Sequence, residues 1–215
     1  MRDVRLNFSK RGGLRFISHL DLSRAMLRSL RRTDIPVWYT EGFNPHPYAT
    51  FALPLPLGAE SENDVMDIRV VGDIKNMAVM EKLNAVLPEG LEITDCYNPV
   101  QPVRAITKAE YLFFFAGHTD PAAVLALLDK GELFCEKTGK SHGKRVVKTV
   151  NLLEGVSEYR FEEQTGAPLL RIELPAGSEK NVNPILLAET MRRQTGIETT
   201  LVRRVALLTE TGPFK

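Results

Sequence analysis

The stretch VRLNFSKRGGLRFISHLDLSRAMLRSLRR, residues 4–32, contains a strand pattern followed by a helix pattern. Apolar and polar residues alternate over 4–8, which is the period of a half-buried strand, and 14–17 resume it briefly. Ser18 and Asp21 occupy the positions of a capping box, and apolar residues then recur at helical spacing to about residue 33. The stretch therefore predicts a strand–helix unit at the start of a mixed α and β domain.

Further along the chain, the same order of elements continues and then recurs. The patterns predict strands at 37–40 and 65–71, a helix from an Asp73 cap to Leu87, and a strand at 91–94. A proline-containing connection over 98–108 follows. The elements predicted after it are a strand at 111–116, a helix opened by Asp120-Pro121, extended segments between 133 and 174, a helix from Asn183-Pro184 to Gly196, and a strand at 199–208.

This order predicts an α+β fold of two tandem ferredoxin-like halves, each with the order βαββαβ. We place the boundary so that residues 1–104 form the first domain and residues 105–215 form the second. The chain is long enough for one large core or for two cores of about 100 residues each. The ferredoxin-like fold serves RNA binding, metabolite sensing and several chemistries, so it does not choose a function.

The composition is that of a globular protein without a membrane segment. Of 215 residues, 43% are apolar and 26% are charged, and the formal net charge is +1. No run of about 18 apolar residues occurs, and no signal-peptide apolar region follows the first residues. We therefore expect a cytoplasmic protein. Cys96 and Cys135 stand alone and far apart, which favours reduced thiols over a disulfide or a metal site.

Charge is distributed unevenly along the chain. Residues 1–32 carry nine Lys or Arg against two Asp, whereas residues 33–104 carry four against eleven Asp or Glu. In the first predicted helix, four arginines fall on one side: Arg24, Arg28, Arg31 and Arg32. Such a stripe either binds phosphates or is a solvated face neutralised by Asp21, Asp34 and Glu41. The sequence leaves both interpretations open.

The most unusual stretch of the chain is the loop Gly42-Phe43-Asn44-Pro45-His46-Pro47-Tyr48. Its two prolines hold the backbone extended around His46, and Gly42 permits a tight turn. Phe43 and Tyr48 offer rings on which a base can stack. The alternative is a rigid structural loop with Phe43 packed inward. We favour the functional interpretation, because loops on a rigid scaffold commonly carry sites.

A second basic stretch covers residues 137–148 and includes Lys140, Lys144 and Arg145. It is polar and broken by glycines, which predicts a flexible loop between strands. Such a loop is either an ordinary surface loop or an arm that follows phosphates. Its glycine spacing is not that of a nucleotide-binding P-loop.

The sequence contains no convincing metal site and no conventional catalytic signature. His19, Asp21 and His46 are the residue types of a two-histidine, one-carboxylate metal set. However, His19 and Asp21 are two positions apart at a helix start and do not share a face, so we expect no metal ligand. P-loop, nucleophile-elbow, Cys-x-x-Cys and His-Glu-x-x-His motifs do not occur. Catalytic residues stay unknown, and the sequence favours a non-catalytic role.

One combination of motifs covers much of the chain: GLRFISHLD (13–21), Arg31-Arg32, Ile35-Pro36-Val37, GFNPHP (42–47), LPLPLG (53–58) with Ser61, and Asn183-Pro184. This combination resembles a bacterial family, the radical-SAM-linked proteins known as domain of unknown function 2344. The resemblance covers nearly the whole chain. It implies a radical S-adenosylmethionine enzyme as partner and no established activity. This chain lacks the three-cysteine motif of an iron–sulfur cluster, so any radical chemistry would belong to that partner, and no cofactor is expected here.

The leading hypothesis is an accessory module that binds ribosomal or transfer RNA and presents it to a radical S-adenosylmethionine enzyme. The runner-up is an RNA-modifying enzyme resembling the two-halved pseudouridine synthases, and the third possibility is a protein–protein adaptor that binds no nucleic acid. A cleft lined by an ionisable group of perturbed pKa would favour the enzyme. A continuous basic surface would favour the binding module.

The candidate RNA- or partner-binding residues come from three segments of the chain. They are Arg15, Ser18, His19, Asp21, Arg24, Arg28, Arg31, Arg32, Phe43, Asn44, His46, Tyr48, Lys140, Lys144 and Arg145. We expect Ser18–Arg32 and Gly42–Tyr48 to lie side by side, because the strand predicted at 37–40 follows the helix directly.

Overall fold

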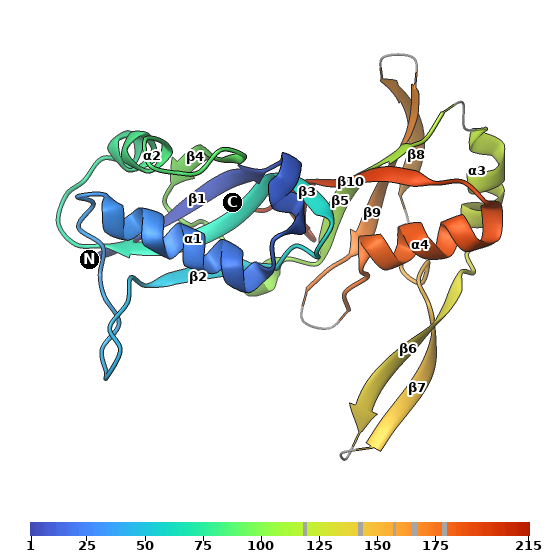
Figure 1. Ribbon diagram of the computed structural model, residues 1–215, viewed down its shortest axis with the longest axis horizontal. Coiled ribbons are helices and arrows are strands. Elements are labelled where there is room, and N and C mark those ends of the chain that lie inside the picture. The colour runs from blue at the N-terminus through green and yellow to red at the C-terminus, as the bar shows by residue number, and fades with distance from the viewer. Residues whose placement is uncertain (118–119, 142–143, 157, 165–166, 178–179) are drawn as a thin grey trace.

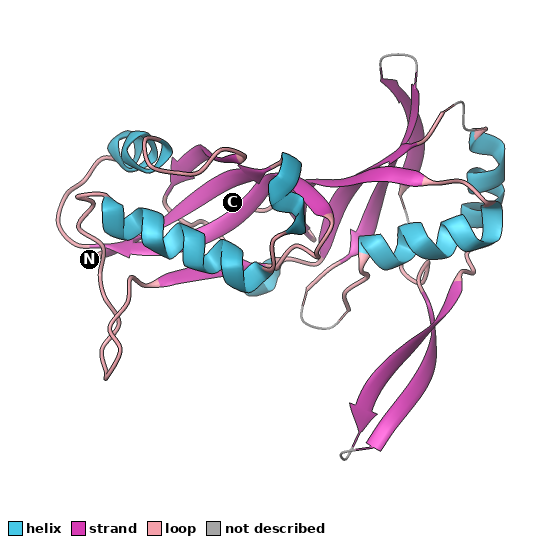
Figure 2. Ribbon diagram, viewed as in Figure 1, coloured by secondary structure: helices cyan, strands magenta, loops and turns pink. Residues whose placement is uncertain are grey.

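One mixed sheet of nine strands runs through the computed structural model of the chain (Figure 1). The structure describes residues 1–117, 120–141, 144–156, 158–164, 167–177 and 180–215. Helices cover the sheet, and two narrow hairpins project beyond it (Figure 2). Within the described residues, every helix is too short or too polar to cross a membrane.

The elements follow the chain as a repeated alternation of strands and helices. The strands are β1 (Arg2–Lys10), β2 (Ala49–Ala52), β3 (Ala59–Val70), β4 (Leu91–Tyr97), β5 (Lys108–Phe115), β6 (Phe134–Ser141), β7 (Lys144–Asn151), β8 (Tyr159–Gln164), β9 (Ala167–Pro175), β10 (Thr199–Thr209) and β11 (Gly212–Pro213). The helices are α1 (His19–Arg32), α2 (Asn76–Asn84), α3 (Pro121–Asp129) and α4 (Pro184–Thr195), with short 3-10 turns η1 (Gly12–Phe16) and η2 (Val103–Ala105).

Strand β3 joins the two halves of the chain into one sheet. The order along the sheet is β4-β1-β3-β10-β5-β9-β8, with β2 beside β3 and β11 beside β10. Most of β3 pairs antiparallel with β1, whereas its first residues pair parallel with β10, Ala59 opposite Val202 and Ser61 opposite Arg204. The α+β class is therefore confirmed, but the two predicted halves do not form two separate sheets.

Two apolar cores lie between the helices and the sheet. In the first, Leu22, Met26 and Leu30 of α1 pack with residues of β1, β3, β4 and α2. The second contains α3 and α4 with β5, β9 and β10, and it also includes Ala52 and Val65 from the first half. Each predicted half thus has a core, but the second core draws apolar residues from both.

Helix ends that depend on local side chains match the sequence predictions. Ser18 caps α1, and its hydroxyl accepts the Asp21 N–H at 3.1 Å and donates to the Asp21 carboxylate at 2.7 Å. Asn183 caps α4, and Gly196 ends it with a φ of 75°. Asp120 caps α3, with Pro121 in its first turn.

Three predictions about elements of the first half are wrong. Residues 14–17 are not a strand, because η1 winds through 12–16. The second strand of the sheet is β2 at 49–52, while 37–40 forms only isolated bridges, since prolines nearby lack the N–H groups that a ladder needs. Helix α2 starts after Lys75 rather than at Asp73, and it ends at Asn84, whose side chain bonds the backbone of Ile93.

Candidate nucleic-acid interface

Helix α1 holds the arginine stripe on its solvent side. Its apolar residues Leu22, Met26 and Leu30 are buried against the sheet, which turns the remaining face outward. Each of the four predicted arginines is exposed: Arg24, Arg28, Arg31 and Arg32. The helix therefore presents four guanidinium groups to solvent along about two turns.

The four arginines differ in their partners. Arg24 pairs with Asp21 across one turn at 3.3 Å, and Arg32 donates a long bond to the Val86 carbonyl at 3.4 Å. Asp34, expected to neutralise the stripe, instead pairs with Lys82 at 2.6 Å. Among the described residues, no acidic side chain forms an ion pair with Arg28 or Arg31. The solvated-face interpretation thus accounts for Arg24 alone.

Residues 37–48 form a hairpin that projects from the end of the sheet beyond the last turn of α1 (Figure 1). Its arms are joined by the Tyr48 N–H to the Trp38 carbonyl and by the Thr40 N–H to the His46 carbonyl, both at 2.9 Å. The Arg69 guanidinium carbon lies 4.7 Å from the Tyr48 ring centre and 5.5 Å from that of Trp38. Arg69 of β3 therefore contacts both arms of the hairpin at its base and holds them against the sheet.

Polar groups close the hairpin just below its tip. The Thr40 hydroxyl accepts the His46 N–H at 3.2 Å, and the His46 Nδ1 lies 3.1 Å from both that hydroxyl and the Asn44 carbonyl. Because a carbonyl only accepts, this contact favours a proton on Nδ1. Beyond these bonds Phe43 is fully exposed, with 105% of its reference surface free. The alternative in which Phe43 packs inward is thus contradicted.

The 37–48 hairpin lies beyond the last turn of α1, so it does not run beside the helix as the sequence predicted (Figure 1). His19, at the start of α1, packs edge-on against Phe51 of β2 with ring centres 5.2 Å apart. His46 belongs to the hairpin beyond the other end of the helix, which is about 21 Å long. The described residues include no group of three or more His, Cys, Asp or Glu able to hold a metal ion. His19 and His46 therefore do not share a site.

Arg15 lies near the start of α1, away from the hairpin. Its guanidinium carbon is 4.7 Å from the centre of the Phe16 ring, and its carbonyl accepts the Gly58 N–H at 2.8 Å. Ser18 and Asp21 are occupied by their mutual capping bonds. These three residues stabilise the local fold, and no contact among them points to a ligand.

The second basic stretch is a β-ribbon, which corrects the prediction of a flexible loop. β6 and β7 pair antiparallel over their whole length, with Lys140 opposite Arg145 and Ser141 opposite Lys144. This ribbon projects beyond the sheet on the same side as the 37–48 hairpin in the view of Figure 1. Residues 142–143, at its turn, lie outside the described residues.

A buried ion cluster between β1, β3 and β10 was missed by the sequence prediction. Arg204 and Asp64 form an ion pair, and Arg204 also donates to the Leu53 carbonyl at 2.8 Å. Lys10 is 2% exposed, and its burial lowers the pKa of its amine, an effect that the Asp64 charge partly offsets. Leu53 has a φ of 44°, a left-handed conformation that is unfavourable for leucine. Charged residues within strand patterns were the available signal, but their partners are distant in sequence.

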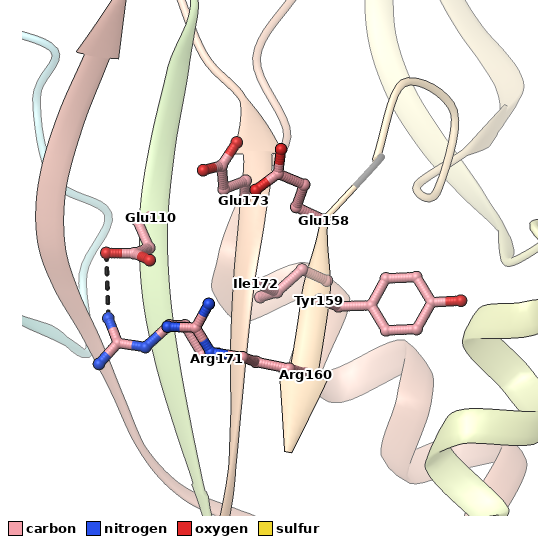
Figure 3. A pocket seen from close by; sticks show the side chains of 7 residues that line it. All are labelled: Glu110, Glu158, Tyr159, Arg160, Arg171, Ile172 and Glu173. Atoms are coloured by element: carbon pink, nitrogen blue, oxygen red, sulfur yellow. Dashed lines mark ion pairs between the residues drawn. The ribbon is translucent and has the colours of Figure 1, made fainter. Parts of the chain in front are cut away.

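The open face of β5, β8 and β9 contains a shallow pocket of about 470 Å³ (Figure 3). Several of its charges are paired: Arg171 contacts Glu110 at 3.0 Å and Glu162 at 2.7 Å. Hydrogen bonds from Arg171 and Arg160 lower the pKa of Glu162. Among the lining residues, Tyr159 points away from the carboxylates and donates to Asp129 at 2.6 Å. Ion pairs between neighbouring strands therefore occupy much of this pocket.

Comparisons with known proteins identify a family and two solved structures of low similarity. A family model described as "Uncharacterized protein conserved in bacteria", domain of unknown function 2344, matches residues 3–184. The structure titled "Crystal Structure of a Cbf5-Nop10-Gar1 Complex" matches with a TM-score of 0.48 and 13% identity, over 95% of this chain and 48% of that chain. The archaeal box H/ACA sRNP Nop10-Cbf5 complex matches with a TM-score of 0.47 and 15% identity, over 99% of this chain and 48% of that one. This chain thus spans about half the length of the solved chains that it matches. No curated protein matches it.

Proposed function

This chain belongs to the bacterial family of domain of unknown function 2344, and from that premise we propose that it is an accessory protein that binds RNA through α1. One observation carries the proposal: Arg28 and Arg31 are exposed on a single helix face without an acidic partner among the described residues. Like charges three positions apart on a helix repel one another. Phosphates would relieve this repulsion and would release counterions on binding.

The proposed RNA is ribosomal or transfer RNA, presented to a radical S-adenosylmethionine enzyme. The chain contains two cysteines, Cys96 on β4 and Cys135 on β6, and they lie in different elements. An iron–sulfur cluster of that enzyme class needs three cysteine ligands close together. In this proposal the partner therefore supplies the radical chemistry, and this chain supplies the RNA contact.

Among the residues that the structure describes, the buried ion cluster is the feature that favours an RNA-modifying enzyme. Lys10, Asp64 and Arg204 are 2%, 3% and 1% exposed, so a substrate cannot reach them without movement of the chain above them. Their ion pair and the Leu53 contact instead hold β10 against β3. The binding function is therefore preferred over catalysis at this cluster.

Two glutamine substitutions test the RNA-binding face. Arg28→Gln/Arg31→Gln is expected to weaken the binding of labelled transfer RNA and ribosomal RNA fragments to a similar extent across sequences. Each lost phosphate contact also lowers the salt slope of the binding constant by about 0.7 to 0.9, depending on strandedness. The measurement is a fluorescence titration at two salt concentrations.

The matched control is Arg192→Gln/Arg193→Gln, which removes two exposed arginines from the last turn of α4. It has the same charge change, so it corrects for a general loss of positive charge. If both double variants bind as wild type does at both salts, α1 is not the phosphate-binding face. Loss of affinity in both variants alike would assign the effect to net charge and not to α1.

We also propose that the boundary at 104/105 separates two related ferredoxin-like units. The strand order is β4-β1-β3-β2 in the first and β10-β5-β9-β8 in the second, each with two helices. When the four strands named in each order are numbered along the chain, leaving out β6, β7 and β11, both orders place the fourth strand beside the first and the third beside the second. In this proposal, the β6–β7 ribbon is an addition to the second unit.

A further inference from the structure

We infer that Phe43, at the tip of the 37–48 hairpin, is a stacking platform for an unpaired RNA base. The ligand class is therefore RNA with single-stranded or looped nucleotides, and not a continuous duplex. This inference rests on the proposed RNA-binding function and adds a second contact to it. The hairpin would select unpaired bases, while α1 would hold the phosphates beside them.

The exposure of Phe43 sets it apart from the other apolar side chains. Its exposed fraction of 105% is higher than that of every other large hydrophobic residue that the structure describes. The next highest are Met1 at 79% and Val100 at 74%. A phenyl ring that stays exposed to water adds no hydrophobic stabilisation to the fold, because it buries no apolar surface. Its position at the tip leaves the whole ring free for a contact outside this chain.

The hairpin is built so that the ring is presented with little freedom. Arg69 bonds Asp3 through its Nε at 2.7 Å and covers the rings of Trp38 and Tyr48, which fixes the base of the hairpin. Thr40 and His46 bond each other across the arms. Because these bonds already order the backbone, binding loses less conformational entropy than binding to a mobile loop would.

The hairpin arm carries Phe43 away from the base of the hairpin. Six residues separate Val37 from Phe43, which at strand spacing is about 20 Å. Non-sequence-specific single-strand sites that combine cations with aromatic rings span about 4–16 nucleotides. The inferred site is of this kind, with Phe43 as its ring and the arginines of α1 as its cations.

Stacking on Phe43 distinguishes unpaired from paired RNA. In a duplex the base faces are covered by neighbouring pairs, so a lone ring finds no free face except at the ends. In a single strand every base offers a face, and stacking does not depend on its identity. The inferred site therefore distinguishes single-stranded from double-stranded RNA, and it does not distinguish one base from another.

The experiment compares variants of the full chain on three RNA probes. The probes are a single-stranded RNA of about 12 nucleotides, a stem with an unpaired loop, and a long blunt-ended duplex that has no loop and few ends per base pair. Phe43→Ala is expected to weaken binding of the single strand by about 5- to 150-fold, which is the range measured for losing one stacked base. Phe43→Tyr is expected to keep the affinity, and duplex binding should not change.

Two further measurements separate stacking from other effects. Met77→Ala removes an apolar side chain that is 60% exposed on α2 and is expected to leave all three affinities unchanged. Phe43→Trp places an indole at the tip, and its fluorescence, after subtraction of the Trp38 signal from wild type, should be quenched by the single strand. The melting temperature of every variant should equal that of wild type.

The outcomes distinguish this inference from the proposed function. If Phe43→Ala binds single-stranded RNA as wild type does while Arg28→Gln/Arg31→Gln binds it weakly, the stacking inference fails and RNA binding by α1 stands. If neither variant changes RNA binding, both fail. Unchanged RNA affinity with loss of a protein that co-purifies with wild type would assign Phe43 to a protein contact and would overturn the inference.

Discussion

At the scale of single residues, Cys96 shows how burial changes chemistry. It lies on β4 opposite Leu6 of β1, with its side chain half-buried. Burial raises the pKa of its thiol to about 11, with the nearby Arg2 charge acting in the opposite direction. The thiolate is the reactive form, so a thiol with this pKa is nearly all protonated at neutral pH.

We expect Cys96 to react slowly with iodoacetamide at pH 7 to 8 and faster as the pH rises toward 11. The sign follows from the raised pKa: the folded protein holds the proton over a range in which an ordinary free thiol, with a pKa of about 8.5, has lost it. Mass spectrometry of the alkylated protein at several pH values measures the rate. Protein unfolded in urea is the control and should react rapidly at pH 8. Equal rates in the folded and unfolded protein would show that the thiol is not shielded.

Single residues also show where sequence reasoning succeeds and where it fails. Ser18 and Asn183 were predicted as caps, because each bonds backbone groups two or three positions away. The pair of Arg204 with Asp64 joins residues 140 positions apart, so no local pattern indicates it. The sequence predicted Phe43 as a binding residue of the loop. That its side chain points outward depends on how the two arms of the hairpin pair, which no local pattern specifies.

At the scale of elements, the 37–48 hairpin replaced a predicted strand. Val37-Trp38-Tyr39-Thr40 has the composition of a strand, and its residues do bond to an extended partner. That partner is the return arm ending at Tyr48, and only the bridge of Val37 to Val70 reaches the sheet. Strand propensity was thus detected correctly, but it does not specify the pairing partner, which depends on tertiary contacts.

Arg69→Leu is expected to loosen this hairpin without unfolding the protein. The substitution removes the cation over the Trp38 and Tyr48 rings and the ion pair with Asp3. Hydrogen exchange at the Thr40 amide, which donates to His46, should become a few-fold faster, as expected for loss of a solvent-exposed cation–π contact. Exchange in α1 should stay at the wild-type rate.

The control is Arg192→Leu, which removes an exposed arginine from α4 and should leave hairpin exchange unchanged. If Arg69→Leu exchanges at Thr40 as wild type does, the backbone bonds alone hold the hairpin. Single-stranded RNA should bind Arg69→Leu more weakly than wild type, because a mobile tip loses more entropy on binding.

At the scale of the whole molecule, the proposed boundary at 104/105 separates two cores that share residues. Ala52 and Val65 belong to the first half of the sequence, yet both pack in the core of the second half. Cutting the chain at the boundary would expose the apolar surface that these residues cover. The second half is therefore expected to fold alone with reduced stability.

Expressed as residues 105–215, the second unit should show a cooperative thermal transition at a lower temperature than the full chain. Its capped helices and four paired strands remain, which supports cooperativity, while the loss of apolar contacts lowers Tm. Circular dichroism against temperature measures both properties. A fragment without a cooperative transition would show that 104/105 does not separate folding units. A Tm equal to that of the full chain would show that the shared residues contribute little.

The pairing of β3 with β10 has a mechanical consequence. Only Ala59–Ser61 and Val202–Arg204 pair across this seam, whereas β1 and β5 pair with their neighbours along most of their lengths. A plate bends where it is narrowest, so elastic deformation of the molecule concentrates at this seam. Arg203 and Arg204 pair across it with Glu60 and Asp64, so these ion pairs add to the three residue pairs that hold the seam together. The 37–48 hairpin and the β6–β7 ribbon lie on opposite sides of the seam, so a bend there would change the distance between them.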